Sequence, residues 1–106
     1  MMNMFSDCNS LIDLNATNFD TAKVTNMASM FFGCEKLSSL NLEKFITNKV
    51  VDMNSMFMGC LSLFSINVSN FDTSHVTNVE HMFSDCWLLH EINISNFNLS
   101  LISSLE

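Results

Sequence analysis

Four cysteines and three histidines are the side chains in this sequence that could act as nucleophiles, bases or metal ligands. The cysteines are Cys8, Cys34, Cys60 and Cys86, and the histidines are His75, His81 and His90. Cys86 and His90 have the residue types of a thiol nucleophile and its base. However, His90 follows a predicted bend, and no glycine-rich loop offers an oxyanion hole. We therefore expect no enzymatic activity from this pair or from the chain.

The spacing of these residues also bears on metal and disulfide chemistry. Zinc sites use cysteine pairs two to four residues apart, whereas successive cysteines here are 26 residues apart. The histidines share no ligand spacing and are expected at the surface. Met27, Met30, Met53 and Met56 follow a helical spacing that is typical of a core. We expect buried, reduced thiols, with no metal ion and no cofactor; the alternative is a disulfide between two stacked cysteines in an oxidising compartment.

The same interval of 26 residues relates every other landmark of the sequence. A phenylalanine precedes each cysteine by three residues, an asparagine follows it by seven, and a second phenylalanine follows it by eleven. These rows are Phe5, Phe31, Phe57 and Phe83; Asn15, Asn41, Asn67 and Asn93; and Phe19, Phe45, Phe71 and Phe97. The chain is therefore a single repeat domain over residues 1–106, with four gapless copies at approximately 4–29, 30–55, 56–81 and 82–106.

The hydrophobic spacing changes within each copy, and this change predicts two kinds of element. From Val24 to Cys34 the apolar steps are three or four residues, which is the spacing of a helical face. Leu40 and Leu42 then alternate with Asn41, as in a strand. We predict helical turns near 25–32, 51–58 and 77–84, and strands near 13–16, 39–42, 65–68 and 91–94. One copy cannot bury its apolar face alone, so the copies should stack as an α/β repeat solenoid, with parallel strands on one face and short helical turns on the other.

One stretch of the second copy carries a family resemblance. Leu37, Leu40 and Leu42 match the L-x-x-L-x-L core of a leucine-rich repeat. Together with the flanking VTNMASMFFGC and NLEKFITNKV, the sequence resembles the 26-residue repeat of BspA-like leucine-rich-repeat surface proteins, mostly bacterial surface proteins and lipoproteins. The resemblance implies a right-handed, leucine-rich-repeat-like solenoid of four turns, a role in adhesion or protein binding, and a location that is secreted or on the cell surface. Phe45 and Phe71 depart from the general pattern, which has Asn or Cys at that place.

Composition excludes several classes of partner. The chain is 48% hydrophobic, only 14% charged, and has a net charge of −7 with four lysines and no arginine. A surface that neutralises phosphates is missing, so we expect no nucleic-acid binding. No apolar run approaches the roughly 18 residues of a membrane span, so we expect no membrane insertion by this segment. The start MMNMFSDC lacks the features of a signal peptide, which leaves a cytoplasmic location open beside the surface location that the resemblance implies.

The strand asparagines and their neighbours are the candidate binding residues. Because they alternate with inward-facing residues, they should point outward and lie in line from copy to copy. The candidates are Asp13, Asn15, Ser39, Asn41, Glu43, Ser65, Asn67, Ser69, Glu91 and Asn93. The row of asparagines has two interpretations that can coexist: an amide ladder that stabilises the stack, or a polar recognition strip.

Two functions follow from this arrangement. The first is a non-catalytic protein-binding or adhesion module, whose polar sheet face binds a protein or a host-surface ligand. The alternative is a structural segment that assembles end to end, because neither end of the sequence shows the polar cap that terminal repeats normally carry. In that case we expect a homo-oligomer, or a fragment of a longer repeat protein, with the Ile92–Ile94 edge as the contact.

Overall fold

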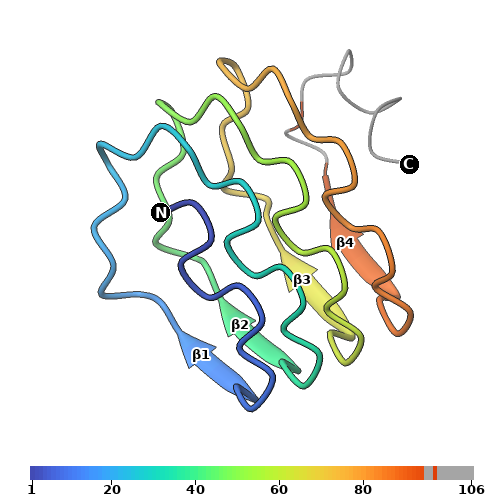
Figure 1. Cartoon of the computed structure of the whole chain (residues 1–106). Coiled ribbons are helices and arrows are strands. Elements are labelled where there is room, and N and C mark those ends of the chain that lie inside the picture. Colours follow the sequence, from blue (N-terminus) through green and yellow to red (C-terminus); the bar gives the residue numbers. More distant parts are fainter. Residues whose placement is uncertain (95–96, 98–106) are drawn as a thin grey trace.

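The computed structural model describes residues 1–94 and residue 97, and within them it contains four strands of three residues each. They are β1 (Asp13–Asn15), β2 (Ser39–Asn41), β3 (Ser65–Asn67) and β4 (Glu91–Asn93). The strands lie side by side in sequence order, one in each copy (Figure 1). The predicted strand positions are therefore confirmed, although each strand ends one residue earlier than expected. Predictions for residues 95–96 and 98–106 lie outside the described residues.

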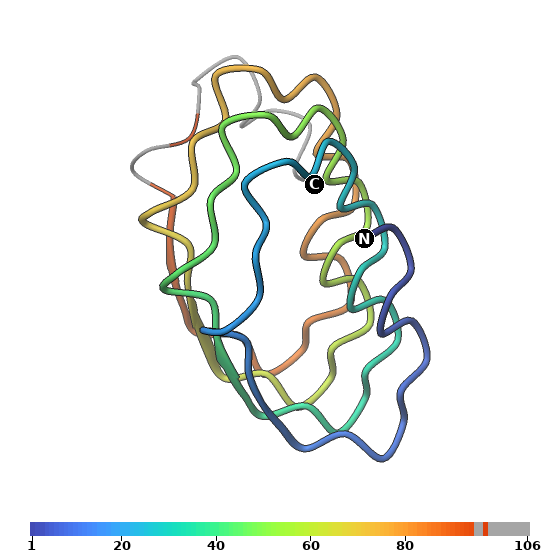
Figure 2. The same ribbon diagram turned by 90° about the vertical axis from the view of Figure 1, so that its left-hand side faces the viewer.

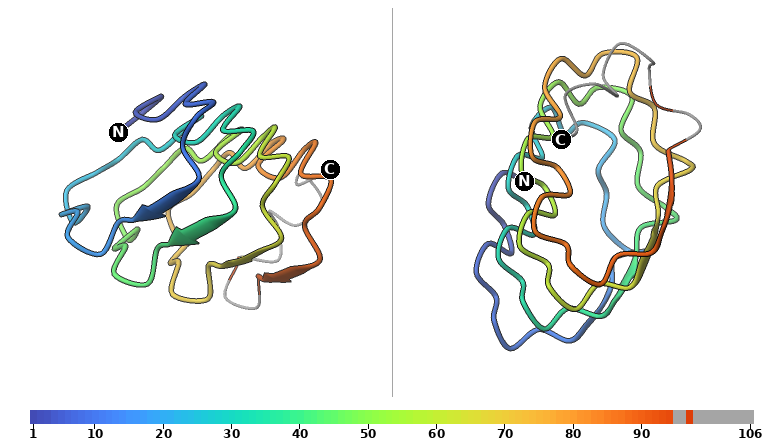
Figure 3. Two further views of the ribbon diagram at one scale, coloured as in Figure 1. Left: turned by 90° about the horizontal axis from the view of Figure 1, so that it is seen from below. Right: turned by 90° about the vertical axis from the view of Figure 1, so that its right-hand side faces the viewer.

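The strands pair in parallel, as predicted, but they form two small sheets instead of one. β1 pairs with β2 and β3 pairs with β4, and each residue lies opposite its equivalent in the next copy, as Leu14 does with Leu40. Isolated parallel bridges join Asn26 to Asp52 and Asp52 to Asn78, so neighbouring copies are also connected away from the strands. The chain winds through successive loops that lie against one another at equivalent positions (Figures 2 and 3).

The prediction of helical turns near 25–32, 51–58 and 77–84 is wrong, since the described residues contain no helix. The backbone hydrogen bonds give the reason, because successive N–H groups alternate between two kinds of acceptor. Met30 donates to the carbonyl of Met27 three residues earlier, whereas Phe31 donates to the carbonyl of Met56 in the next copy, at 2.9 Å. In an α-helix every N–H would bond four residues back. The apolar steps of three and four therefore come from consecutive tight turns that share their hydrogen bonds with the neighbouring copy.

Left-handed backbone at two positions in each copy shapes these turns. The first position is held by Asn3, Ser29, Ser55 and His81, with φ between 55° and 60°. The second, four residues later, is held by Asp7, Gly33, Gly59 and Asp85, with φ of 58°, 72°, 77° and 60°. A left-handed residue at every fourth position interrupts a right-handed helix. At Gly33 an added β-carbon would collide only with the flexible carboxylate end of the Asp7 side chain, so the left-handed backbone is the reason that glycine is favoured there.

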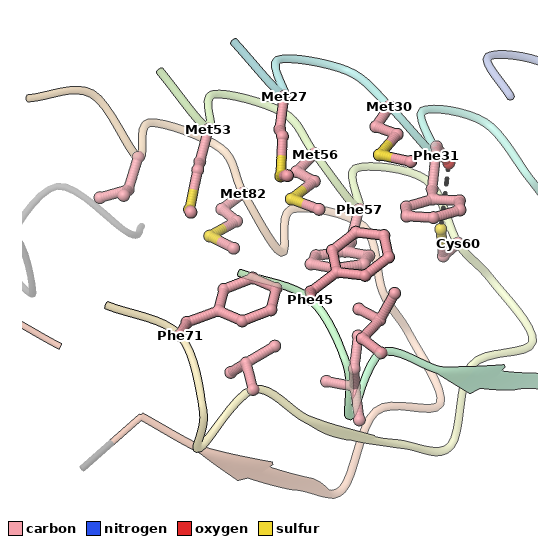
Figure 4. Close-up of a cluster of buried hydrophobic side chains, with 14 of the residues drawn as sticks. Met27, Met30, Phe31, Phe45, Met53, Met56, Phe57, Cys60, Phe71 and Met82 are labelled. Atoms are coloured by element: carbon pink, nitrogen blue, oxygen red, sulfur yellow. Dashed lines mark hydrogen bonds between the residues drawn. The ribbon is translucent and has the colours of Figure 1, made fainter. Parts of the chain in front are cut away.

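The interior is filled by rows of equivalent residues. Phe5, Phe31, Phe57 and Phe83 form one row, in which neighbouring ring centroids are 5.5 to 5.6 Å apart and the planes differ by 2° to 7°. Phe19, Phe45 and Phe71 form a second row with a spacing of 6.4 Å. Met27, Met30, Met53, Met56 and Met82 lie fully buried in the same core (Figure 4). The four methionines predicted to be core residues are therefore confirmed as such.

Buried threonines provide a hydrogen-bonded row that the sequence analysis did not single out. They are Thr21, Thr47 and Thr73. The Thr47 hydroxyl donates to the Asp72 carbonyl at 3.1 Å and accepts from the Asp72 N–H at 2.8 Å. Thr21 bonds to both backbone groups of Ile46 in the same way. The hydroxyls of Thr21 and Thr47 thus take the place of a peptide group between neighbouring copies, at partly buried positions.

Candidate functional site

The outer face of the strands carries eight of the ten residues predicted to bind a partner. The eight are Asp13, Asn15, Ser39, Asn41, Ser65, Asn67, Glu91 and Asn93, and all except the half-buried Asn41 are exposed. We call this surface the sheet face. The parallel register brings Asp13 beside Ser39 and Asn67 beside Asn93. The other two predicted residues, Glu43 and Ser69, lie two positions beyond the strand asparagines in the turns that follow β2 and β3.

The strand asparagines hold the turns that follow them. Asn15 Oδ1 accepts from the backbone N–H of Thr17 at 3.1 Å, and Asn41 Oδ1 accepts from that of Glu43 at 3.0 Å. Asn67 Oδ1 accepts from the backbone N–H of Ser69 at 3.0 Å and from its hydroxyl at 2.6 Å. These are local turns of the kind asparagine favours. No hydrogen bond joins one amide to the next among Asn15, Asn41 and Asn67, so the expected amide ladder is not formed there.

A different asparagine, Asn70, makes the bonds that link neighbouring copies. Its Nδ2 atom lies 3.2, 3.2 and 3.0 Å from the carbonyl oxygens of Leu42, Glu43 and Phe45 in the preceding copy. The Leu42 carbonyl also accepts the Phe45 N–H at 3.0 Å. The second copy has Lys44 at the position equivalent to Asn70, so no such set of bonds joins the second copy to the first.

The sheet face is hollowed over its last two strands. An open pocket of about 480 Å³ is lined by the three residues of β3, the three residues of β4 and His90. Its polar groups are the Ser65 hydroxyl, the amides of Asn67 and Asn93, the Glu91 carboxylate and the His90 imidazole. No lysine lines this pocket. It therefore offers donors, acceptors and one negative charge.

An aromatic pair stands at the rim of this pocket, and the sequence analysis missed it. The Phe64 ring stacks on the His90 ring with centroids 4.9 Å apart and planes 18° apart. The Phe64 side chain is nevertheless 54% exposed, and Trp87, three residues before His90, is 75% exposed. The sequence did contain a signal that Phe64 is exposed. The equivalent positions in the other copies are Ile12, Ser38 and His90, and a position that varies between polar and apolar residues is not part of the core.

The cysteines form a row of thiols that bond to backbone carbonyls. Cys34 and Cys60 are buried, as predicted, whereas Cys8 and Cys86 are only half-buried; all four are free. The sulfur of Cys34 lies 3.0 Å from the Phe5 carbonyl oxygen, and Cys60 bonds to Phe31 in the same manner. Burial holds these side chains in their protonated form and raises the pKa of Cys34 to about 11.

Cys86 and His90, the candidate nucleophile and base, are engaged with other groups. The Cys86 thiol donates to the Phe57 carbonyl at 3.0 Å, and burial raises its pKa to about 11. The His90 ring stacks on Phe64, and its Nδ1 lies 2.7 Å from the Leu88 carbonyl oxygen. A reactive cysteine needs a lowered pKa. The environment of Cys86 is the opposite of the one that activates a thiol.

Two further features concern the part of the chain that the structure describes. No three side chains of His, Cys, Asp or Glu gather there in a way that could hold a metal ion. Nor does this part of the chain contain a helix with the length and apolar character needed to cross a membrane.

Comparison with known proteins gives a family but no described function. Neither a curated protein nor a solved structure matches this chain. One family model matches all of it, over residues 1–106, and its members share a repeated sequence of undefined role. The chain belongs to the family described as "Mycoplasma protein of unknown function, DUF285".

Proposed function

We propose that this protein is a non-catalytic binding or adhesion module, and that its sheet face binds a protein or another ligand on a host surface. One observation carries the proposal. Equivalent polar residues that project from parallel strands are brought into register, so that Asp13 lies beside Ser39 and Ser65 beside Glu91 on an exposed surface. An extended row of exposed polar groups on a stacked scaffold is the usual binding surface of repeat proteins.

The finer assignment of the fold belongs to the same proposal. The loops of the chain would form a right-handed, leucine-rich-repeat-like solenoid of the BspA-like type, displayed on the cell surface or secreted. Support comes from the Leu37, Leu40 and Leu42 spacing and from the parallel pairing of strands one copy apart. Fold analogy of this kind does not by itself give a ligand.

Substitution of two serines on the sheet face tests the proposal. Ser39 and Ser65 lie in the strands, and neither side chain caps a turn as the asparagines do. Ser39→Arg with Ser65→Arg should abolish the binding of protein-coated beads to cultured animal cells, while the circular dichroism spectrum stays native. Asn9→Arg with Asn48→Arg is the control, because this pair adds the same two charges at exposed positions outside the sheet face. Unchanged binding by the double variant would contradict the proposal.

Self-assembly is the second candidate, and the last strand favours it. The Ile92 side chain is 37% exposed in β4, whereas its equivalent Ile66 in β3 is only 5% exposed. An exposed strand edge next to apolar surface is a template for another chain. Light scattering over a concentration series should then show growth that Ile92→Lys prevents. A particle of constant mass would exclude this candidate.

A further inference from the structure

The pocket over β3 and β4 combines three features. It has a volume of about 480 Å³, which lies within the range of about 300–1,000 Å³ typical of small-molecule sites. Amide, hydroxyl and carboxylate groups line it. At its rim the planar Phe64 and His90 rings are stacked and exposed.

One polar group of the pocket, the amide of Asn67, is held in place by the turn already described. Asn67 uses its Oδ1 atom to accept from both donors of Ser69, and this fixes the plane of its amide. Its Nδ2 group is therefore oriented as a donor before any ligand arrives, which lowers the entropic cost of binding. Glu91, on the neighbouring strand, is exposed and provides carboxylate acceptors.

The aromatic pair supplies the apolar part of the surface. Phe64 packs on His90 through one face, yet Phe64 remains 54% exposed to solvent. An exposed planar ring next to fixed hydrogen-bonding groups suits a ligand that has an apolar face and a polar edge. A sugar ring has both, because its C–H groups form one face and its hydroxyls form the edge.

Charge decides between neutral and acidic sugars. The residues that line the pocket include Glu91 but no lysine, and the chain as a whole has a net charge of −7. A carboxylate or sulfate on the ligand would meet like charge without a cation to offset it. Neutral hydroxyls, by contrast, can donate to Glu91 and accept from Asn67.

We propose that the pocket over β3 and β4, with the Phe64–His90 pair at its rim, binds a neutral glycan. The sugar ring stacks on the exposed part of Phe64, and its hydroxyls bond to Asn67, Glu91 and the other polar groups of the strands. The inference rests on the proposed function, since it gives a ligand class to one end of the sheet face.

A glycan panel tests this inference on the intact chain. The panel contains neutral oligosaccharides that end in glucose, galactose, mannose or N-acetylglucosamine, together with sialylated and sulfated oligosaccharides. We expect binding to members of the neutral set, with the affinity measured by calorimetry. Phe64→Ala and Glu91→Ala should each weaken that affinity by about ten-fold or more.

Ile12→Ala is the matched control. Ile12 holds the same position in the first copy as Phe64 does in the third, and it is similarly exposed at 59%. Its replacement should leave the affinity unchanged, and circular dichroism checks that every variant is folded. Binding to acidic glycans only, an equal loss with Ile12→Ala, or no binding to any glycan would overturn the inference.

Failure of this inference can be distinguished from failure of the proposed function. If no glycan binds but Ser39→Arg with Ser65→Arg still abolishes attachment to cells, the sheet face binds a ligand of another class. If neutral glycans bind as described but the double variant attaches to cells normally, the pocket is a glycan site and the role in adhesion is wrong.

Discussion

The sulfur of Cys60 lies 3.2 Å from the carbonyl oxygen of Phe31, the residue that precedes the equivalent cysteine, Cys34, by three positions. That carbonyl also accepts the N–H of Cys34 at 3.2 Å. One buried oxygen therefore takes two hydrogen bonds, one within its own copy and one from the next copy. The same relationship joins Cys86 to Phe57.

Removal of the Cys60 thiol should destabilise the protein. Cys60→Ala deletes a fully buried sulfur and its bond to Phe31, and we expect a loss of about 1–2 kcal/mol in the free energy of unfolding. Cys8→Ala is the matched control, because Cys8 is half-buried and its thiol makes no hydrogen bond to a backbone carbonyl among the described residues. Urea unfolding measures the free energy of unfolding of both variants. An equal loss for the two variants would show that the bond between copies contributes nothing.

The stability of the fold should fall in alkaline solution. Burial raises the pKa of Cys34 and Cys86 from 9.0 to about 11 in the folded chain. Above pH 9 the unfolded chain loses these protons first, so this stability is present below pH 9 and is lost as the pH rises through about 11. Each thiol lowers the free energy of unfolding by up to about 1.4 kcal/mol per pH unit in this window.

Urea unfolding between about pH 8 and about pH 10.5 measures this slope. The double variant Cys34→Ala with Cys86→Ala should show a shallower decline, because it lacks these two thiols while Cys60, whose pKa burial also raises, remains in both proteins. Identical slopes for the two proteins would contradict the prediction.

Substitution of Thr47 tests how much the hydroxyls of the buried threonines contribute to stability. Thr47→Val keeps the shape but removes both bonds to Asp72, and we expect a cost of about 1–3 kcal/mol because the Asp72 backbone groups lose a buried partner. Thr47→Ser keeps the hydroxyl and should cost less. Chemical unfolding measures the free energy of unfolding of the two variants. A smaller loss of stability for Thr47→Val than for Thr47→Ser would mean that the methyl group contributes more than the hydrogen bonds.

Gly59 tests the left-handed turns. Its φ is 77°, and an added β-carbon would make only ordinary contacts, so the cost of a side chain there is backbone strain. Gly59→Val should cost about 1–3 kcal/mol, whereas Gly59→Asp should cost less because Asp7 and Asp85 hold the same position in other copies. Thermal unfolding measures the midpoints of the two variants, and that of Gly59→Val should be the lower. Equal midpoints would show that strain at this position is unimportant.

The sequence predicted the strands well because two independent signals agreed there. Leu40 and Leu42 alternate with Asn41, and the same alternation recurs at a fixed interval in every copy. Repetition also made the parallel register predictable, since equivalent residues must lie beside each other when copies stack. The burial of Cys34 and Cys60 followed from the same argument.

The turns could not be predicted from apolar spacing alone. Steps of three and four arise both from an α-helix and from consecutive tight turns, and hydrophobic spacing does not distinguish them. The distinguishing signal was the polar and glycine residues four positions apart, such as Ser29 with Gly33 and Ser55 with Gly59. Hydrogen bonds between side chain and backbone, including those of Thr47 and Asn70, depend on the conformation of the neighbouring copy and are not visible in a single repeat.

The uniform phenylalanine row has a consequence for how genes of this kind can change. The spacing between Phe5 and Phe31 is 5.5 Å, that between Phe31 and Phe57 is 5.6 Å, and that between Phe57 and Phe83 is 5.5 Å. Each copy therefore presents nearly the same surface to its successor. Within this row, an in-frame duplication or deletion of one whole copy creates no new kind of contact, only one more or one fewer of those already present. The phenylalanine row therefore does not fix the number of copies.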